Sequence, residues 1–371
     1  MKKVALIVSA PMTFNAFYLN HIKYIKTKYD VTLIANFAEN EVILPDVKHI
    51  ALNLDRKPSI TDDLKNLKKL TEIFKREDFD IVHSTTPKAG FVTQIAGVLS
   101  GRKVRLHTFT GQVWANKTGV KREALKLIDK TIAKLSTHLL ADSKSQIDFL
   151  ISEHITVNAK IQVLGSGSIS GVNNAKFYPR NTDVLREKLG FSKDDFVFLF
   201  IGRLNSDKGV KDLIKSFELV YQQRSQAKLL IVGVDEENLL PSIQNNKLFN
   251  SAIFYQGFTK VPEEYMAMAD VMCLPSYREG FGSVIVEASA CGTPTIGSNI
   301  YGITDAIEDG KSGYLFQVGD TQDLAKKMIY CIDNTEELQR VIEYGKQRIK
   351  EKFDADLSSQ LLLDYYQSIL V

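Results

Sequence analysis

The sequence predicts an α/β protein with two domains, each built on a doubly wound parallel sheet. Short apolar runs rich in β-branched and aromatic residues alternate with helical patterns along most of the chain, which is typical of a parallel sheet covered by helices on both faces. A chain of 371 residues, 44% hydrophobic and 25% charged, is long enough for two separate cores. We predict a first domain at residues 1–180 and a second at 181–354, because loop-forming residues are dense from Gly165 to Pro179.

The first domain is expected to alternate strands and helices, with ligands beyond the carboxyl ends of the strands. A clear helix follows Ile60, where Thr61 can cap the first turn and Asp62 and Asp63 suit its positive end. The predicted strands are Val4 to Val8, Val31 to Ile34, His49 to Leu52, Ile81 to Ser84, Arg105 to Phe109 and His138 to Ala141.

The second domain shows the same alternation. Its predicted strands are Phe196 to Ile201, Leu229 to Gly233, Ile253 to Gly257 and Val271 to Leu274. A helix is predicted from Val261 to Ala269, and the end of the chain, from Leu338 to Val371, has the apolar spacing of helices.

Charge is divided unevenly along the chain. Residues 1–170 contain 25 Lys and Arg against 16 Asp and Glu, and the rest contain 22 against 28, so the first part is near +9 and the second near −6. A basic part favours an anionic partner such as a lipid headgroup or a pyrophosphate. No interleaved basic and aromatic pattern supports nucleic acid as a partner. No apolar run approaches the ~18 residues of a membrane span.

The remaining composition predicts a cytoplasmic protein without a metal. Cys273, Cys291 and Cys331 lack the spacing of metal ligands and are expected to be reduced and buried. The apolar run after Met1 is short and predicts a first strand, not a signal peptide. Asp-x-Asp pairs at 78–80 and 354–356 precede a buried strand and open a terminal helix, so neither is expected to bind a metal.

The segment from Ser276 to Pro294 carries the strongest functional signal. It follows a predicted buried strand, and Gly280 and Gly282 let the backbone pass close to a ligand before a helix begins. A helix N-terminus attracts phosphate through its amides and dipole. Glu279 precedes that terminus and Glu287 lies about two turns later, a spacing that suits a nucleotide sugar. Taken singly, Glu279 is equally well a helix cap and Glu287 a solvated helix position.

The whole string resembles the E-x7-E signature of the retaining glycosyltransferases of family 4, through Glu279, Glu287, Ala288, Gly292 and Pro294. The resemblance implies the GT-B fold, in which two Rossmann-like domains face a central cleft and the C-terminal helix, about 355–371 here, crosses back to the first domain. It also implies that Glu279 meets the donor sugar, that the backbone of Phe281 to Ser283 meets the diphosphate, and that Glu287 binds the ribose.

Further site residues follow from the same resemblance. Arg203 and Lys208 resemble the clamp for the donor diphosphate, and Gly257 with Phe258 falls where the family holds the base. His107 falls where the family places a histidine at the donor sugar; a histidine alone at a strand end is more often a structural hydrogen-bond partner. The implied catalytic residues are His107, Arg203, Lys208 and Glu279, and the implied donor-binding residues are Arg203, Lys208, Gly257, Phe258, Glu279, Gly280, Phe281, Gly282, Ser283 and Glu287.

Two features are assigned to the acceptor and membrane side. The loop after the first strand lacks the family's glycines and contains Thr13, Phe14 and Asn15 instead. A predicted helix from Lys121 to Leu135 has a basic stripe, which is either a solvated surface or a contact with an anionic inner-membrane surface. The stripe consists of Arg122, Lys126, Lys130 and Lys134.

The sequence as a whole therefore predicts a retaining glycosyltransferase, cytoplasmic and peripheral on the inner face of the cell membrane. It is expected to move a sugar from a nucleotide diphosphate donor, for which UDP is the expected nucleotide. The expected acceptor is a lipid-linked saccharide or an oligosaccharide in surface polysaccharide assembly, such as that of O-antigen. No cofactor is expected. Two alternatives stay open, a non-hydrolysing nucleotide-sugar epimerase on the same fold and a binding protein with a dead site.

Overall fold

The computed structural model describes residues 1–37, 46–54 and 60–370. The chain divides into two compact units, one made of Met1–Gly171 with Ala355–Val371 and the other of Val172–Asp354. The division falls before the predicted boundary at 180, because Val172 N–H donates to the Phe353 carbonyl at 2.6 Å and Asn174 Nδ2 donates to Asp354 Oδ2 at 2.7 Å. These bonds tie the start of the loop that follows Gly171 to the second unit.

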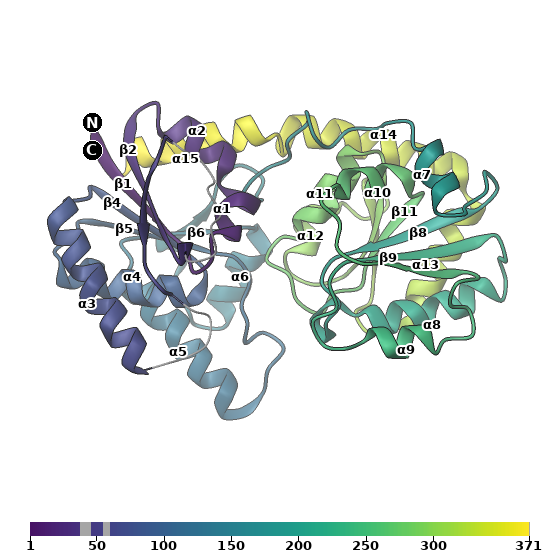
Figure 1. The fold of residues 1–371 in the computed structure, drawn as a ribbon, viewed down its shortest axis with the longest axis horizontal. Coiled ribbons are helices and arrows are strands. Elements are labelled where there is room, and N and C mark those ends of the chain that lie inside the picture. The colour runs from purple at the N-terminus through teal and green to yellow at the C-terminus, as the bar shows by residue number, and fades with distance from the viewer. Residues whose placement is uncertain (38–45, 55–59, 371) are drawn as a thin grey trace. The chain divides into compact units, whose positions relative to one another are not determined.

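The described part of the first unit forms a seven-stranded parallel sheet in the order β3-β2-β1-β4-β5-β6-β7 (Figure 1). Side chains alternate along its strands, so Val4 and Leu6 enter one core cluster while Ala5 and Ile7 enter another on the opposite face. This confirms the predicted doubly wound architecture. The strands are β1 (Lys2–Ile7), β2 (Tyr29–Ala35), β3 (Lys48–Ala51), β4 (Ile81–Thr85), β5 (Val104–Phe109), β6 (His138–Ala141) and β7 (Ile161–Val163).

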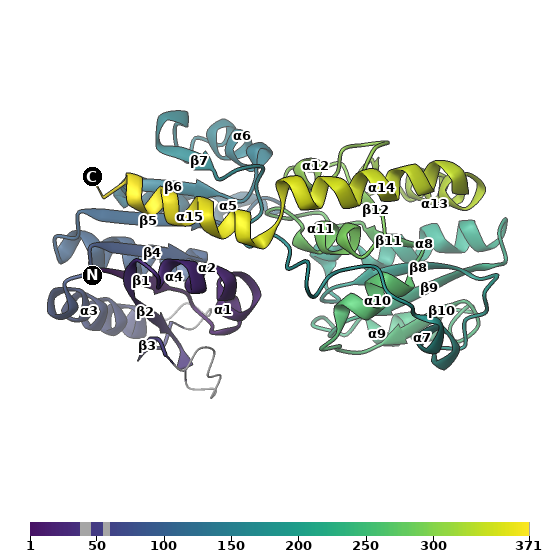
Figure 2. The ribbon, with the colours of Figure 1, turned by 90° about the horizontal axis from the view of Figure 1, so that it is seen from above.

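Helices cover both faces of this sheet, with α3, α4 and α5 on one face and α1, α2 and α15 on the other (Figures 1 and 2). The helix α15 is held on α2 by polar contacts: Asn20 Nδ2 donates to the Ala355 carbonyl at 2.9 Å, and His21 Nδ1 lies 3.0 Å from Ser359 Oγ. The helices are α1 (Met12–Phe17), α2 (Leu19–Ile25), α3 (Ile60–Glu77), α4 (Pro87–Leu99), α5 (Gly119–Leu135), α6 (Lys144–Ser152), η2 (Asn158–Lys160) and α15 (Ala355–Ser368).

The second unit contains a six-stranded parallel sheet in the order β10-β9-β8-β11-β12-β13. Its strands are β8 (Phe196–Ile201), β9 (Ala227–Val232), β10 (Ile253–Gln256), β11 (Val271–Leu274), β12 (Thr295–Ser298) and β13 (Gly313–Phe316). Its helices are α7 (Asp183–Lys188), η3 (Ser206–Lys208), α8 (Val210–Tyr221), α9 (Leu240–Gln244), α10 (Pro262–Met268), α11 (Ser283–Ala290), α12 (Ile303–Ala306), α13 (Thr321–Asp333) and α14 (Thr335–Lys352).

Two predictions from composition can be compared with the structure. Cys273, Cys291 and Cys331 are free and buried, as the sequence predicts for reduced thiols. Within the described ranges, no helix combines the length and the apolar character that crossing a membrane requires.

A small cavity lies inside the first unit. Its volume is about 30 Å³, and its lining includes His21, His83 and Asp142. His83 is bonded on both ring nitrogens, with Nδ1 2.6 Å from Tyr366 Oη and Nε2 2.7 Å from Thr108 Oγ1. Asp142 Oδ1 is buried and has no hydrogen-bond partner among the described residues. Burial therefore raises the pKa of Asp142 to about 8, so this side chain is a neutral carboxylic acid at neutral pH.

Asp142→Asn should stabilise the protein at alkaline pH, with the gain disappearing toward pH 4. The folded-state pKa of about 8 lies above the ~3.9 of an unfolded aspartate, so the folded state binds more protons between these values. Asp142 therefore contributes its full stabilisation below about pH 4. This contribution to the free energy of unfolding is lost as the pH rises through 8. Thermal unfolding from pH 4 to 9 measures this pH dependence of stability. The control is Asp148→Asn, at an exposed position of α6. An unchanged pH profile in Asp142→Asn would contradict the assignment.

Candidate functional site

The predicted anion site lies where the strand order of the second unit reverses. β8 pairs with β9 on one side and with β11 on the other, so the loops after β8 and β11 leave the same sheet edge as neighbours. Gly209, with φ 66°, makes their close approach possible, because a Cβ there would lie 2.0 Å from the Pro275 carbonyl oxygen. Ligands of open α/β sheets bind at such a switch point.

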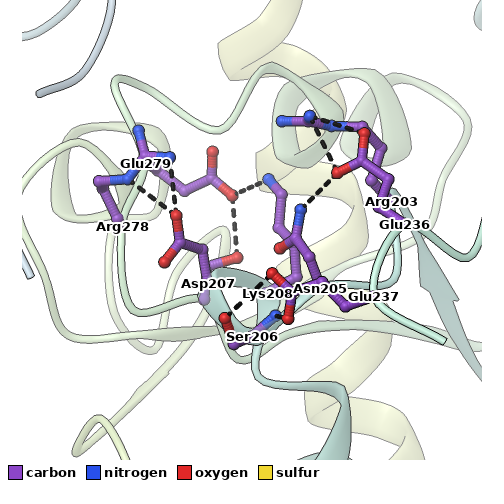
Figure 3. A network of polar contacts seen from close by, with 10 residues as sticks. Arg203, Asn205, Ser206, Asp207, Lys208, Glu236, Glu237, Arg278 and Glu279 are labelled. Atoms are coloured by element: carbon purple, nitrogen blue, oxygen red, sulfur yellow. Dashed lines mark hydrogen bonds and ion pairs between the residues drawn. The ribbon is translucent and has the colours of Figure 1, made fainter. Parts of the chain in front are cut away.

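Glu279 is held at this point by a lysine and a serine. Lys208 Nζ donates to Glu279 Oε1 (Figure 3). Ser276 Oγ donates to the same oxygen at 2.8 Å. Both members of the ion pair are largely buried, with 18% of the lysine and 13% of the glutamate side chain exposed. Because α11 begins at Ser283 with Gly282 as its N-cap, Glu279 is not a helix cap. The structure thus brings together two residues that the sequence assigned to one site.

A second ion pair joins the same two loops. Arg278 Nη2 and Nε donate to Asp207 Oδ2 at 2.8 and 3.2 Å (Figure 3). Tyr277 N–H donates to the Asp207 carbonyl at 2.8 Å. Sequence reasoning missed Asp207 and Arg278. Their only signal was position, since each precedes a predicted site residue, Lys208 and Glu279 respectively.

Arg203, the other predicted cation, is paired with a residue from a third loop. Its Nη1 donates to Glu236 Oε1 at 3.0 Å and to Oε2 at 3.1 Å, and Asn205 Nδ2 donates to Glu236 Oε2 at 2.8 Å (Figure 3). Arg203 is 54% exposed. Glu236 follows β9 and was not among the predicted site residues, because nothing in its own segment marks it as the partner of Arg203.

The glycine-containing turn and the start of α11 have the local structure that an anion site requires. Gly282 is in the left-handed region with φ 73°, and no side chain caps the helix that begins at Ser283. The Phe281 side chain is only 2% exposed and packs near Phe353, with 5.4 Å between ring centroids. From Gly280 to Ser283, the backbone is therefore the part suited to meet a diphosphate.

Glu287 lies in the second turn of α11 and is partly buried, so it is not a freely solvated helix position. Burial raises its pKa to about 7; the charge of Lys176 opposes this shift and that of Glu263 adds to it. Lys176 Nζ also lies 3.5 Å from Glu263 Oε2. A residue from the loop after Gly171 thus helps keep Glu287 ionised, a link that the sequence did not reveal. The proposed ribose contact of Glu287 stays a prediction.

The predicted base-binding residues follow β10, two strands away from β8 in the sheet order. The Gly257 carbonyl accepts a hydrogen bond from Gly233 N–H at 3.2 Å, which joins the ends of β9 and β10. Phe258 is 68% exposed, so its ring is open to stack on another planar group. Their contact with a base stays a prediction.

His107 does not lie where its predicted role requires. It is 1% exposed, its Nδ1 lies 2.9 Å from Ser84 Oγ, and a Cβ on Gly90 would come within 2.4 Å of its ring. Burial lowers the pKa of His107 to about 3, so the ring is neutral. This corrects the prediction that His107 faces a donor sugar, because the ring points into the core from within β5. The first partly exposed residue at the end of that strand is Thr110.

The loop after β1 is also only partly available to an acceptor. Phe14 is fully buried between Tyr18 and Phe37, and Thr13 is 8% exposed. Asn15 is exposed. The prediction for Phe14 is therefore wrong, because α1 turns this aromatic side chain into the core of the first unit.

The basic stripe on α5 is divided by its contacts. Lys126 is 8% exposed and donates to Glu153 at 2.7 Å, Arg122 pairs with the same glutamate at 2.6 Å, and both lie over the Trp114 ring. Lys130 is partly buried and Lys134 is exposed. The four residues therefore do not form one exposed face, because Glu153 and Trp114 from other segments cover Arg122 and Lys126. A membrane contact of this helix stays a prediction.

The Asp-x-Asp pairs have partners within the protein. Asp80 accepts from Lys3 N–H at 2.7 Å and Asp78 pairs with Arg102. Asp354 accepts from Asn174 Nδ2 at 2.7 Å. In the part of the chain that the structure describes, no group of three or more His, Cys, Asp or Glu side chains is arranged to hold a metal ion.

Comparison with known proteins matches both units of the chain. The family described as glycosyl transferases group 1 matches residues 181–348, and the family described as glycosyl transferase 4-like matches residues 3–142. The capsular polysaccharide biosynthesis glycosyltransferase CapM of Staphylococcus aureus is 30% identical over 330 residues, which cover 88% of this chain and 86% of CapM.

Two further proteins add a sequence and a structural likeness. The Escherichia coli UDP-Gal:alpha-D-GlcNAc-diphosphoundecaprenol alpha-1,3-galactosyltransferase is 28% identical over 291 residues, covering 76% of this chain and 73% of the relative. The crystal structure of Anabaena HepE in complex with UDP-glucose has a TM-score of 0.81 at 20% identity, covering 99% of this chain and 100% of HepE.

Proposed function

Because the chain belongs to the group 1 glycosyltransferases and has the GT-B fold, we propose that it is a retaining enzyme with a UDP-linked sugar donor and a lipid-linked or oligosaccharide acceptor. The chain is a glycosyltransferase of polysaccharide biosynthesis. Its donor, its acceptor and the stereochemistry of transfer are what we propose. The observation that carries the donor assignment is the arrangement of Arg203, Lys208 and Glu279 at the switch point of the second sheet.

Two kinds of evidence support a nucleoside diphosphate donor. Lys208 and Arg203 lie at the carboxyl end of β8, and the uncapped start of α11 follows β11 on the same edge, so two cations and a helix dipole are available to a diphosphate. The structurally similar HepE is bound to UDP-glucose, and the E. coli relative is named for a UDP-sugar donor and a lipid diphosphate acceptor.

The residues of the site would act mainly by electrostatics. The bond between the sugar's anomeric carbon and the diphosphate oxygen breaks, the acceptor oxygen bonds to that carbon on the same face, and the acceptor's hydroxyl proton passes to the departing phosphate. Arg203 and Lys208 would stabilise the negative charge that develops on the leaving group. Glu279, oriented by Lys208 and Ser276, would receive the sugar hydroxyls. Since the two cations supply positive charge, we propose that turnover needs no metal ion.

A panel of UDP-sugars with a lipid diphosphate saccharide acceptor tests this proposal. We expect one donor to be consumed with formation of an α-configured product, and the rate to persist in excess EDTA. Product of inverted configuration, no transfer from any UDP-sugar, or loss of the rate in EDTA with rescue by magnesium or manganese would each contradict a part of the proposal. A parallel incubation of the donor alone separates transfer from epimerisation, which would yield an epimer without acceptor.

We further propose that the first unit is peripheral on the cytoplasmic face of the cell membrane. The support for a membrane contact comes from exposed apolar residues of α5 and not from the basic stripe. Val120 is 88% exposed and Leu127 is 64% exposed. Val120, Leu127 and the exposed Lys134 are seven residues apart, so all three lie on one side of the helix. Exposed apolar side chains with lysines near them are typical of helices that lie in the membrane interface.

The double substitution of Val120→Asp and Leu127→Asp should strongly reduce sedimentation with anionic liposomes, because it places two charges where the helix would enter the interface. Val184→Asp in the second unit, at a position 79% exposed, is the matched control and should sediment like wild type. Unchanged liposome binding of the double variant would contradict this surface, and unchanged hydrolysis of the donor would show that the site itself is intact.

A further inference from the structure

The ion pair between Arg203 and Glu236 engages one terminal nitrogen of the Arg203 guanidinium. Both carboxylate oxygens accept from Arg203 Nη1, at 3.0 and 3.1 Å (Figure 3). A carboxylate with two acceptor oxygens is the same kind of partner for a guanidinium as a phosphate group. Any phosphate that binds Arg203 at this nitrogen must therefore displace Glu236.

Glu236 is held in place by the backbone on which it sits. The segment after β9 runs beside the segment after β8, with Leu204 N–H donating to the Val234 carbonyl at 2.8 Å and Glu236 N–H donating to the Leu204 carbonyl at 3.1 Å. Asp235 accepts from the N–H groups of Leu239 and Leu240 at 2.9 and 2.8 Å, which anchors the same turn. The carboxylate of Glu236 is thus presented to Arg203 by an ordered turn.

The turn also distinguishes Glu236 from its neighbour. Glu237 accepts from the backbone N–H of Ser206 at 2.9 Å and from Ser206 Oγ at 3.3 Å, so it holds the loop after β8 (Figure 3). Glu236 instead contacts the side chains of Arg203 and Asn205. The two adjacent glutamates of this turn therefore have different partners. Glu237 holds the backbone of a loop, and Glu236 contacts a cation that is predicted to bind the diphosphate.

We propose that Glu236 competes with the nucleoside diphosphate for Arg203 and thereby speeds release of this product after sugar transfer. The inference rests on the proposed function, in which Arg203 binds the diphosphate. The pair is easily exchanged, because Arg203 is 54% and Glu236 38% exposed, and an exposed ion pair is weak. Because Glu236 and a diphosphate would bind the same guanidinium, the carboxylate limits how tightly the site holds a diphosphate. In many enzymes product release limits turnover, and a competitor of this kind shortens that step.

The test is the affinity and dissociation rate of UDP in Glu236→Gln, measured by calorimetry and stopped flow. Removing the competing charge should tighten UDP binding by about fivefold, the equilibrium factor of a weak exposed ion pair, and most of the change should appear as slower dissociation. Glu237→Gln is the matched control and should bind UDP within about twofold of wild type. Weaker or unchanged UDP binding in Glu236→Gln would overturn the inference.

A double-mutant cycle separates this inference from the proposed function. In an Arg203→Ala background, Glu236→Gln should no longer tighten UDP binding, because the cation for which Glu236 competes is gone. If Glu236→Gln still tightens binding there, Glu236 does not act through Arg203 and the inference fails. If Arg203→Ala by itself leaves UDP affinity unchanged, the diphosphate clamp of the proposed function fails instead. Thermal unfolding of each variant confirms that the fold is retained.

Discussion

Replacing Lys208 by methionine should weaken the binding of UDP by roughly 5- to 150-fold, which is about 1 to 3 kcal/mol. Methionine keeps the length and apolar stem of the side chain but removes the charge that would bond the diphosphate. It also leaves Glu279, only 13% exposed, without its cationic partner, so an anion would then face the incoming phosphates. Isothermal titration with UDP measures the loss.

Lys215→Met is the matched control for this variant, because Lys215 is exposed on α8 in the same unit and is not among the predicted site residues. It should bind UDP like wild type. Lys208→Arg should recover part of the affinity, since a guanidinium restores the charge with a different shape. If Lys208→Met kept its fold and bound UDP with wild-type affinity, the assignment of diphosphate binding to this loop would be wrong.

Glu279→Gln should lower kcat by on the order of 100-fold while changing the donor KM much less. A carboxylate that accepts hydrogen bonds from the sugar hydroxyls binds the sugar more strongly as positive charge develops on it in the transition state, and a neutral amide does so less. The position of Glu279 is set by Lys208 and Ser276, so the isosteric glutamine keeps the packing while removing the charge. Steady-state kinetics with the identified donor separates kcat from KM.

Glu287→Gln provides the contrast for Glu279. If Glu287 binds the ribose, its substitution should raise the donor KM and leave kcat closer to wild type, since a ribose contact is made equally in the ground state and the transition state. The same kinetic signature in both variants would show that the division of roles between the two glutamates is wrong.

The strands could be predicted because they depend on local patterns. Each of the ten predicted strands overlaps a strand of the structure, from β1 with Val4 to β11 with Val271. A buried parallel strand is a short run of apolar residues, and the alternation with helices allows few arrangements other than a doubly wound sheet. The sequence places Arg203 and Lys208 after one predicted strand and Glu279 after another, but that β8 and β11 are neighbours in the sheet is a finding of the structure.

Burial of individual polar and aromatic side chains could not be predicted in the same way. Lys126 has the spacing of a solvated helix position, yet Trp114 and Glu153 from other segments enclose it. Phe14 lies in a loop-like sequence but packs in the core, and His107 lies within a strand that is covered on both faces. Exposure depends on which element packs over a residue, and that is a property of the fold.

The sequence by itself determined the class of fold and the strands that precede the site, because hydrophobic periodicity acts over a few residues. Its resemblance to family 4 indicated the site residues that follow β8 and β11. Only the tertiary structure decided the partners of these charges. Arg203 meets Glu236 across 33 positions, and Lys208 meets Glu279 and Asp207 meets Arg278 across 71 positions each. Charged side chains interact through distances of a few ångströms, and folding sets those distances independently of separation along the chain.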